Sequence, residues 1–248
     1  MTVDGAGAAT LEGRDVNVHY QGVRAVDGVD LTLRQGRILG LIGPNGAGKT
    51  TFLHAVSGFA PLTAGTVLLD GRDVTGSSPA DLARAGMART FQDSRVFKGM
   101  TVSENVELGA LGAGLRRRAA RDRAREVLAQ LGIDHLAGRW SGGLAVGDER
   151  RVGLARAVAM QPRFLLLDEP AAGLNEQESR ELARAIRDLR DRLACGVLLV
   201  EHDMSVIFGV CDEIQVLESG KTIAFGPPEE IRGDKAVIEA YFGTRGEG

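Results

Sequence analysis

Short apolar runs alternate with longer amphipathic stretches along this chain. Three runs, at residues 38–42 (ILGLI), 164–167 (FLLL) and 197–200 (VLLV), are bounded by polar or turn residues, which is typical of buried strands in a parallel sheet. The stretch after the second run has the period of a helix with one apolar face, which consists of Leu182, Ile186, Leu189 and Leu193. Asn175 and Glu178 predict an N-terminal cap for this helix. Strands that alternate with helices predict an α/β fold with a layered core.

The two ends of the chain differ in composition from the part between them. The first ten residues, MTVDGAGAAT, are rich in Gly and Ala, and the end, GTRGEG, is similar. We expect residues 1–10 to be disordered, residues 11–243 to form one domain, and residues 244–248 to be a flexible tail.

The segment GPNGAGKTT, at residues 43–51, matches the phosphate-binding motif G-x-x-x-x-G-K-[ST] in full. It follows an apolar run and leads into a helix-compatible sequence, which is the context that the motif requires. Its glycines let successive backbone N–H groups converge on phosphate oxygens, and the helix start adds the positive end of its dipole. Lys49 can bridge the β- and γ-phosphates, and the Thr50 hydroxyl can ligate Mg²⁺. We therefore predict a nucleotide site here.

Charged residues follow the two later apolar runs directly. Asp168 and Glu169 come after FLLL, where Asp168 can hold Mg²⁺ through water and Glu169 can deprotonate an attacking water. Glu201, His202 and Asp203 come after VLLV, and His202 can reach the γ-phosphate from there. An acidic pair or a single histidine is common on protein surfaces. Their order behind a phosphate-binding loop favours a nucleotide-hydrolysing site.

Composition narrows the class of partner. The chain is 44% hydrophobic and 25% charged with a net charge of −3, so its overall charge does not favour nucleic acid. We interpret the basic cluster at residues 116–125 as a solvated helix face. Cys195 and Cys211 lack CxxC spacing, which favours a reducing compartment. No stretch approaches the ~20 apolar residues of a membrane span, so we expect any membrane-spanning part to belong to another chain.

The order of these motifs resembles the ATP-binding-cassette (ABC) ATPases over about residues 11–243. The resemblance implies an α/β P-loop NTPase core, an antiparallel β subdomain at the N-terminus, and an inserted helical subdomain at about residues 93–160. It implies that Tyr20, in VHYQGVRAVDGVDL, stacks on adenine. It also implies that Gln92, in ARTFQ, senses Mg²⁺ and couples to a partner chain.

The family's five-residue signature is ambiguous in this chain. Ser141-Gly142-Gly143 looks like its core, but in the family the signature begins ten residues before the Leu of the sequence LARA. Here LARA begins at Leu154, so the signature begins at Leu144. The serine-glycine triplet comes three residues too early, which is about 4.5 Å along a helix, and is a false match.

The resemblance implies a complete set of site residues, with ATP and Mg²⁺ as ligands. The nucleotide-binding residues are Tyr20, Gly43, Pro44, Asn45, Gly46, Ala47, Gly48, Lys49, Thr50, Thr51, Gln92, Leu144, Ala145, Val146, Gly147 and Asp148. The catalytic residues are Glu169, His202 and Lys49, and the metal-binding residues are Thr50, Gln92 and Asp168.

Four stretches look very similar to one branch, the LivG-like ATPase subunits of branched-chain amino acid importers. They are GMARTFQDSRVFKGMTVSENV, LLLDEPAAGLN, VEHDMSVIFGVCDEIQVLESG and GPPEEIRGDKAVIEAYFG. A leucine-alanine signature with one glycine and Asn175 after the acidic pair also match that branch. Asp148 replaces the usual Gln, and the segment from Glu107 to Leu128 looks shorter than in typical members. That segment faces the membrane subunit in the family, so the identity of the transported solute stays an open question.

These observations predict the ATPase subunit of an ABC importer on the cytoplasmic face of the cell membrane. It dimerises head to tail around two ATP, with a second copy or a sister subunit, and drives transmembrane permease subunits that receive solute from a binding protein. Two other classes remain as alternatives. An ABC ATPase outside transport usually carries two cassettes or a coiled-coil insertion. A P-loop kinase does not need residues 144–157 or His202 in this order.

Two finer expectations concern single side chains. Residues 93–106 are predicted to dock on a membrane subunit through Phe97 and Met100, unless these two fill the core of the helical subdomain. Asp148 is predicted to turn away from the phosphate, towards N–H groups of its own helix or towards Arg151, because like charges at close range repel.

Overall fold

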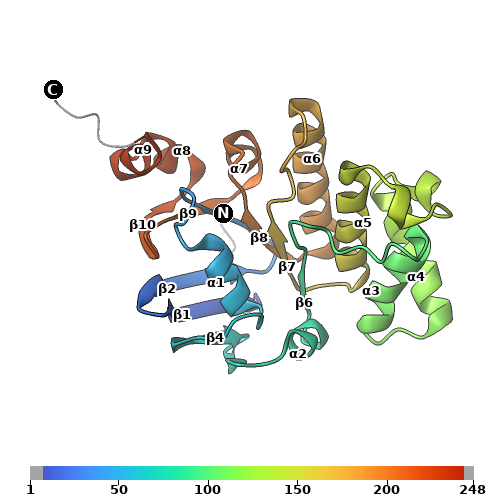
Figure 1. Cartoon of the computed structure of the whole chain (residues 1–248), viewed down its shortest axis with the longest axis horizontal. Coiled ribbons are helices and arrows are strands. Elements are labelled where there is room, and N and C mark those ends of the chain that lie inside the picture. Colours follow the sequence, from blue (N-terminus) through green and yellow to red (C-terminus); the bar gives the residue numbers. More distant parts are fainter. Residues whose placement is uncertain (1–7, 243–248) are drawn as a thin grey trace.

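The computed structural model describes residues 8–242, which form two sheets surrounded by helices (Figure 1). Of the predicted disordered segment 1–10, residues 1–7 lie outside the described part, and so does the predicted tail 244–248. Thr10 already belongs to the first strand, so the folded part begins at least one residue before the predicted boundary at residue 11.

The larger sheet carries the three strands that the apolar runs predict. Its spatial order is β10-β9-β3-β8-β7-β6, and β10 at one edge is antiparallel to β9, whereas the other neighbours are parallel. The strands are β10 (Lys221–Gly226), β9 (Glu213–Glu218), β3 (Ile38–Ile42), β8 (Gly196–Val200), β7 (Phe164–Asp168) and β6 (Met87–Arg89). The central strands β3, β7 and β8 are buried throughout because both of their faces are covered.

Side chains that alternate along a strand enter two different hydrophobic cores. In β7, Leu165 and Leu167 pack into a core formed with the helices, whereas Phe164 and Leu166 pack into a core formed with the smaller sheet and α1 (Lys49–Val56). This two-residue period is what a strand between two covering layers requires. It explains why the three runs read as continuous apolar sequence.

The smaller sheet is antiparallel, in the order β2-β1-β4-β5. Its strands are β2 (Val23–Arg34), β1 (Thr10–Tyr20), β4 (Ala64–Leu69) and β5 (Arg72–Asp73). In Figure 1, α1 lies between the two sheets, and it buries Phe52, Leu53 and Val56 there. The predicted antiparallel β layer at the N-terminus is confirmed.

The helices gather in separate groups (Figure 1). Those between β6 and β7 lie together at one end of the molecule, within the range 93–160 that was expected to be helical: α3 (Val102–Gly112), α4 (Arg117–Gln130), η1 (Asp134–Leu136), η2 (Ser141–Gly143) and α5 (Val146–Ala159). The others are α2 (Pro79–Arg84), α6 (Glu176–Leu193), α7 (Met204–Val210), α8 (Pro228–Gly233) and α9 (Lys235–Phe242). The predicted cap of α6 is present, since Asn175 and Glu178 form a reciprocal capping box.

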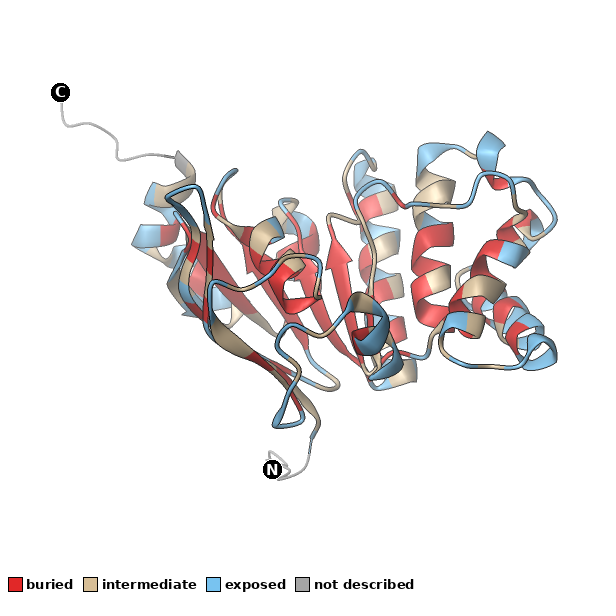
Figure 2. Ribbon diagram, turned by 60° about the horizontal axis from the view of Figure 1, so that its bottom comes forward, coloured by how far each residue is buried: buried red, intermediate tan, exposed pale blue. Residues whose placement is uncertain are grey.

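Buried residues concentrate in the larger sheet and on the helix faces that point towards it (Figure 2). Helix α4, by contrast, exposes most of its charged residues and buries Ala120, Ala124, Val127 and Leu128. Within residues 8–242, no helix combines the length and apolar character that crossing a bilayer requires.

Candidate functional site at the carboxyl edge of the larger sheet

Four loops meet at one edge of the larger sheet because they follow strands that run in the same direction. The loop 43–48 follows β3, Gln92 comes soon after β6, Glu169 follows β7, and His202 follows β8. Carboxyl ends of parallel strands are where α/β proteins bind ligands. The sheet therefore brings together predicted site residues that are up to 160 positions apart in the sequence.

The loop 43–48 needs glycine at two points where the backbone approaches other segments. A Cβ atom at Gly43 would lie 2.1 Å from the carbonyl oxygen of Leu217, and one at Gly48 would lie 2.3 Å from that of Ala25. Both residues also have positive φ, of 148° and 103°. Only glycine combines this backbone with these contacts, so the loop is held tightly against β9 of the larger sheet and β2 of the smaller one.

Lys49 begins α1 and turns its side chain back over the loop. Its Nζ donates hydrogen bonds to the carbonyl oxygens of Gly43 (2.6 Å) and Pro44 (3.1 Å). Burial lowers the pKa of Lys49, while the charges of Glu169 and Asp168 oppose that shift. The ammonium group therefore lies among the loop and the two acidic residues, and Thr50 next to it is exposed.

Two other predicted site residues, Gln92 and His202, lie beside the carboxylate of Glu169. Gln92 Nε2 donates a hydrogen bond of 2.9 Å to Glu169 Oε2, and His202 Nδ1 lies 3.8 Å from Oε1. The backbone of Glu169 has φ of 47°, in the left-handed region that non-glycine residues seldom occupy. Such a conformation in a residue between a buried strand and a turn fits a functional position.

Glu201 joins two of these loops, although the sequence motifs assign no role to it. It is completely buried, and its carboxylate accepts hydrogen bonds from the backbone N–H groups of Ala171 (2.5 Å), His202 (3.0 Å) and Asp203 (3.3 Å). Burial raises the pKa of Glu201, and these three N–H groups partly oppose that effect. A charged residue directly after four buried apolar positions was the available sign in the sequence.

The start of α5 bears on the ambiguous signature. Ser141–Gly143 forms a separate 3₁₀ turn, and the buried Ser141 hydroxyl accepts a hydrogen bond from Asn105 Nδ2 (3.0 Å). Ala145 is the N-cap of α5, so the helix begins inside residues 144–148, as the register argument predicts. The triplet lies before this helix and cannot supply its first turn.

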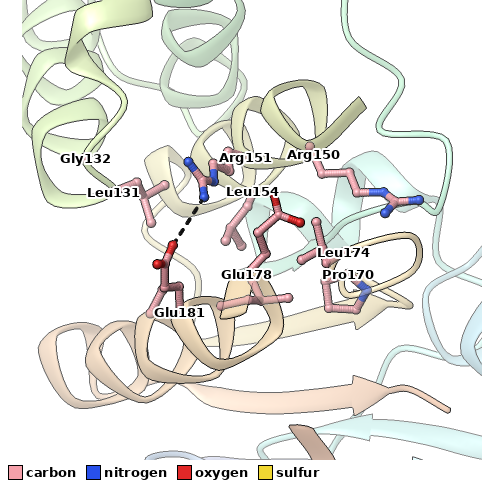
Figure 3. Close-up of a pocket in the computed structure, with 12 residues that line it drawn as sticks. Leu131, Gly132, Arg150, Arg151, Leu154, Pro170, Leu174, Glu178 and Glu181 are labelled. Atoms are coloured by element: carbon pink, nitrogen blue, oxygen red, sulfur yellow. Dashed lines mark ion pairs between the residues drawn. The ribbon is translucent and has the colours of Figure 1, made fainter. Parts of the chain in front are cut away.

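Asp148 does not make the predicted contact with Arg151. Arg151 instead lies 3.8 Å from Glu181 of α6, as the dashed line in Figure 3 marks. No side chain caps the first turn of α5, so Asp148 does not serve that purpose either. The predicted partners of Asp148 were wrong because the position of α6 beside α5 is not visible in the sequence. That Asp148 turns away from the phosphate stays a prediction.

Between α5 and α6 lies a cavity of about 290 Å³ (Figure 3). Leucines from four segments form much of its wall, and charged side chains stand at its rim. The leucines are Leu131, Leu154, Leu174 and Leu182. The cavity separates the helical group from the larger sheet's own helices, so these two parts are not tightly packed there.

Comparison with known families decides what this site belongs to. Residues 26–172, more than half of the chain, match the family described as ABC transporter. The chain belongs to the ABC transporter ATPases. This cassette also matches, over residues 221–247, the family described as branched-chain amino acid ATP-binding cassette transporter.

Individual relatives agree with the family. The high-affinity branched-chain amino acid transport ATP-binding protein LivG of Salmonella typhimurium is 43% identical over 241 residues, covering 91% of this chain and 94% of LivG. The lipopolysaccharide export system ATP-binding protein LptB of Escherichia coli is 36% identical, covering 95% and 98%. The crystal structure of the ADP conformation of MJ1267, an ATP-binding cassette of an ABC transporter, is 27% identical with a TM-score of 0.86, covering 96% and 100%.

Among residues 8–242, Tyr20, Phe97 and Met100 make no hydrogen bond to the predicted site residues in the four loops. Tyr20 ends β1 and is 48% exposed, at the tip of the hairpin in which it pairs with Val23. Phe97 is 52% exposed, and its backbone is fixed by two hydrogen bonds with the side chain of Asn105. Phe97 therefore does not fill the core of the helical group, whereas Met100 is half-buried.

The C-terminal part of the cassette reaches the phosphate-binding loop, which the sequence did not reveal. Tyr241 of α9 is packed against the core, and its hydroxyl is buried without a hydrogen-bond partner among residues 8–242. Burial raises the pKa of this hydroxyl, while the nearby backbone N–H of Gly43 opposes the shift. Tyr241 thus contributes to the surroundings of the loop.

Proposed function

We propose that this cassette is the ATP-hydrolysing subunit of an importer for a small solute, with branched-chain amino acids as the first candidates. The observation that carries the solute assignment is the match of residues 221–247 to the branched-chain amino acid family. The higher identity to LivG than to the lipopolysaccharide export protein LptB supports import over export.

ATP binding is assigned to residues 43–51 together with Tyr20. The backbone N–H groups of the loop and the start of α1 surround the triphosphate, and Tyr20 stacks on the adenine. Lys49 exchanges its hydrogen bonds with Gly43 and Pro44 for phosphate oxygens, so its present partners keep the side chain at the right place before ATP arrives. Hydrogen bonds to the charged phosphates are stronger than those to neutral carbonyl groups.

Mg²⁺ is assigned to Thr50, Gln92 and Asp168. Their hydroxyl, amide and carboxylate oxygens are the hard ligands that this ion prefers. Asp168 ends β7, and Thr50 lies in the first turn of α1, which comes after β3 of the same sheet. When bound, Mg²⁺ supplies positive charge that offsets the negative charge of the phosphate groups. Thr50 is exposed and free to turn towards such an ion.

Hydrolysis is assigned to Glu169 as the general base. Gln92 binds one of its carboxylate oxygens through a hydrogen bond, and His202 lies 3.8 Å from the other. A carboxylate within reach of a water molecule can take its proton as the water attacks the γ-phosphate. His202, which is exposed, completes the surroundings of the γ-phosphate.

Two cassettes are assigned to close head to tail around two ATP. Residues 144–148 of one chain, which contain the start of α5, then face the γ-phosphate bound by the other chain. The exposed side chain of Val146 and the free first turn of α5 leave this surface available. Loss of the γ-phosphate removes the contact that joins the two chains, and this cycle switches the transmembrane subunits.

Membrane recruitment is assigned to residues 93–106, on the cytoplasmic face of the membrane. We expect Phe97→Asp to abolish co-sedimentation with membranes that carry the permease subunits, because a charge replaces the exposed apolar anchor. The melting temperature of the purified cassette should stay nearly unchanged, since an exposed substitution typically changes stability by less than about 0.5 kcal/mol.

Phe225→Asp is the matched control for that experiment. Phe225 lies on β10 and is 54% exposed, close to the value for Phe97, but it belongs to no assigned surface. Equal loss of recruitment in both variants would show that the effect is not specific to residues 93–106. Unfolding of the Phe97→Asp cassette would favour a role in the core instead.

Purification of the tagged cassette with the membrane proteins of its neighbouring genes tests the function as a whole. The complex in liposomes, supplied with its solute-binding protein, should accumulate labelled leucine, isoleucine or valine when ATP and Mg²⁺ are present. ATP hydrolysis without uptake of these three would refute the solute assignment alone. Transfer of the γ-phosphate to a small acceptor in place of water would refute the assignment as a transport ATPase.

A further inference from the structure

Arg89, the last residue of β6, is buried beside Asp168 although no motif points to it. Its Nη2 donates a hydrogen bond of 2.8 Å to Asp168 Oδ2, and the two side chains are only 4% and 6% exposed. The β6 and β7 strands are parallel neighbours, and this pairing brings Arg89 next to the end of β7. Asp168 is the residue assigned above to Mg²⁺, so its ion pair bears on that assignment.

The guanidinium group of Arg89 is fixed on its other sides as well. Nη1 donates a hydrogen bond of 2.8 Å to the buried hydroxyl of Ser57, which follows α1. The guanidinium carbon also lies 5.4 Å from the centre of the Phe59 ring and 4.9 Å from that of Phe91. These two rings contact each other edge to face at 5.1 Å. The cation is thus held by a carboxylate, a hydroxyl and two aromatic rings.

This arrangement determines how the carboxylate of Asp168 lies. Among residues 8–242, Arg89 makes the only hydrogen bond to this carboxylate, and it uses only Oδ2. The peptide N–H of Asp168 is bound separately, to the Thr90 hydroxyl at 3.3 Å. A planar guanidinium fixes the plane of a carboxylate more strictly than an ammonium group does. Oδ1 is therefore left in a defined direction and is available to another ligand.

We infer that Arg89 is a positioning residue that orients Asp168 for Mg²⁺. This inference rests on the proposed function, since it requires the site to bind Mg²⁺ with ATP. The alternative is that the arginine competes with Mg²⁺ for the carboxylate. The contacts with Ser57, Phe59 and Phe91 favour positioning, because they hold the guanidinium where it binds Oδ2.

The experiment measures binding of fluorescent mant-ATP to the full-length chain while Mg²⁺ is titrated from an EDTA solution. For Arg89→Met we expect the Mg²⁺ concentration at half-maximal binding to rise about 10- to 100-fold, the usual effect of losing a partner that orients a metal ligand. Arg89→Lys keeps the positive charge but lacks the planar guanidinium group. Its Mg²⁺ requirement should therefore lie between those of wild type and Arg89→Met. Affinity for mant-ATP in EDTA should stay within about twofold of wild type, because the side-chain hydrogen bonds of Arg89 within residues 8–242 go to Ser57 and Asp168 and not to residues 43–51.

Arg163→Met is the control. Arg163 directly precedes β7, the strand that ends at Asp168, and it pairs with Asp70 at a more exposed place. This variant should bind Mg²⁺ and mant-ATP as the wild type does. An unchanged or lower Mg²⁺ requirement in Arg89→Met would overturn the inference, and the lower value would identify competition. A wild-type chain with no Mg²⁺-dependent binding would instead refute the proposed function.

Phe59→Ala keeps the test decisive if Arg89→Met does not fold. Phe59 is 45% exposed, so its truncation leaves the buried ion pair intact while removing one support of the guanidinium. This variant should raise the Mg²⁺ requirement by a smaller factor than Arg89→Met, and circular dichroism checks its fold. A Mg²⁺ requirement equal to that of wild type would contradict the inference.

Discussion

Glu169→Gln is expected to lower ATP turnover by about 10²–10⁴, the span that a general base contributes. Glutamine has the same shape as glutamate but cannot accept the proton of the attacking water. Affinity for ATP should be retained, because Glu169 lies beside the loop 43–51 and not within it. The variant should therefore accumulate as an ATP-bound dimer, which size-exclusion chromatography with ATP measures.

Glu181→Gln provides the matched control for this loss. It is the same chemical change at an exposed carboxylate on α6, where Arg151 is the partner at 3.8 Å. Its turnover should equal that of wild type, since exposed ion pairs contribute little. If Glu169→Gln kept turnover within a factor of three of wild type, another group would have to be the base.

Gly43→Ala is expected to lower the free energy of unfolding by about 2–6 kcal/mol and to abolish ATP binding. The new Cβ would lie 2.1 Å from the Leu217 carbonyl oxygen, and such overlap costs about 1–3 kcal/mol. The φ of 148° adds about 1–3 kcal/mol of backbone strain. Relief requires the loop to move away from β9, which displaces the N–H groups assigned to phosphate. Urea unfolding and mant-ATP fluorescence measure the two effects.

Gly46→Ala separates the collision from the backbone strain. Gly46 also has positive φ, of 80°, but nothing lies within 4 Å of a Cβ built there. Gly46→Ala should lower the free energy of unfolding only by the backbone strain, about 1–2 kcal/mol. Equal destabilisation by both substitutions would mean that contact with Leu217 does not fix the loop.

The parts of the fold that the sequence predicts are those with a local pattern. The strands β3, β7 and β8 are fully buried because both faces of the sheet are covered, and the cap of α6 lies within four residues. The start of α5 within residues 144–148 could be found by counting back from Leu154. These features depend on neighbours in sequence, so periodicity and motif spacing are sufficient to find them.

The contacts that the sequence does not predict join distant segments. Arg89 and Asp168 are 79 positions apart, and β6 is too short, at three residues, to show a period. Arg151 meets Glu181 and not Asp148 because α5 and α6 pack side by side. Nothing in the spacing of these residues indicates such pairs, since they arise from the packing of whole elements.

Glu201 limits which insertions the loop after β7 can accept during evolution. Its buried carboxylate reaches a backbone N–H, that of Ala171, so it constrains the position of the loop and not the side chain at position 171. Substitutions at that position can therefore be tolerated if they fit the space. An insertion between residues 168 and 171 moves the N–H away and leaves a buried charge without one of its partners, which costs up to about 3–5 kcal/mol. Functional relatives that have a glutamate at position 201 should accordingly keep the same number of residues between the acidic pair and the following turn.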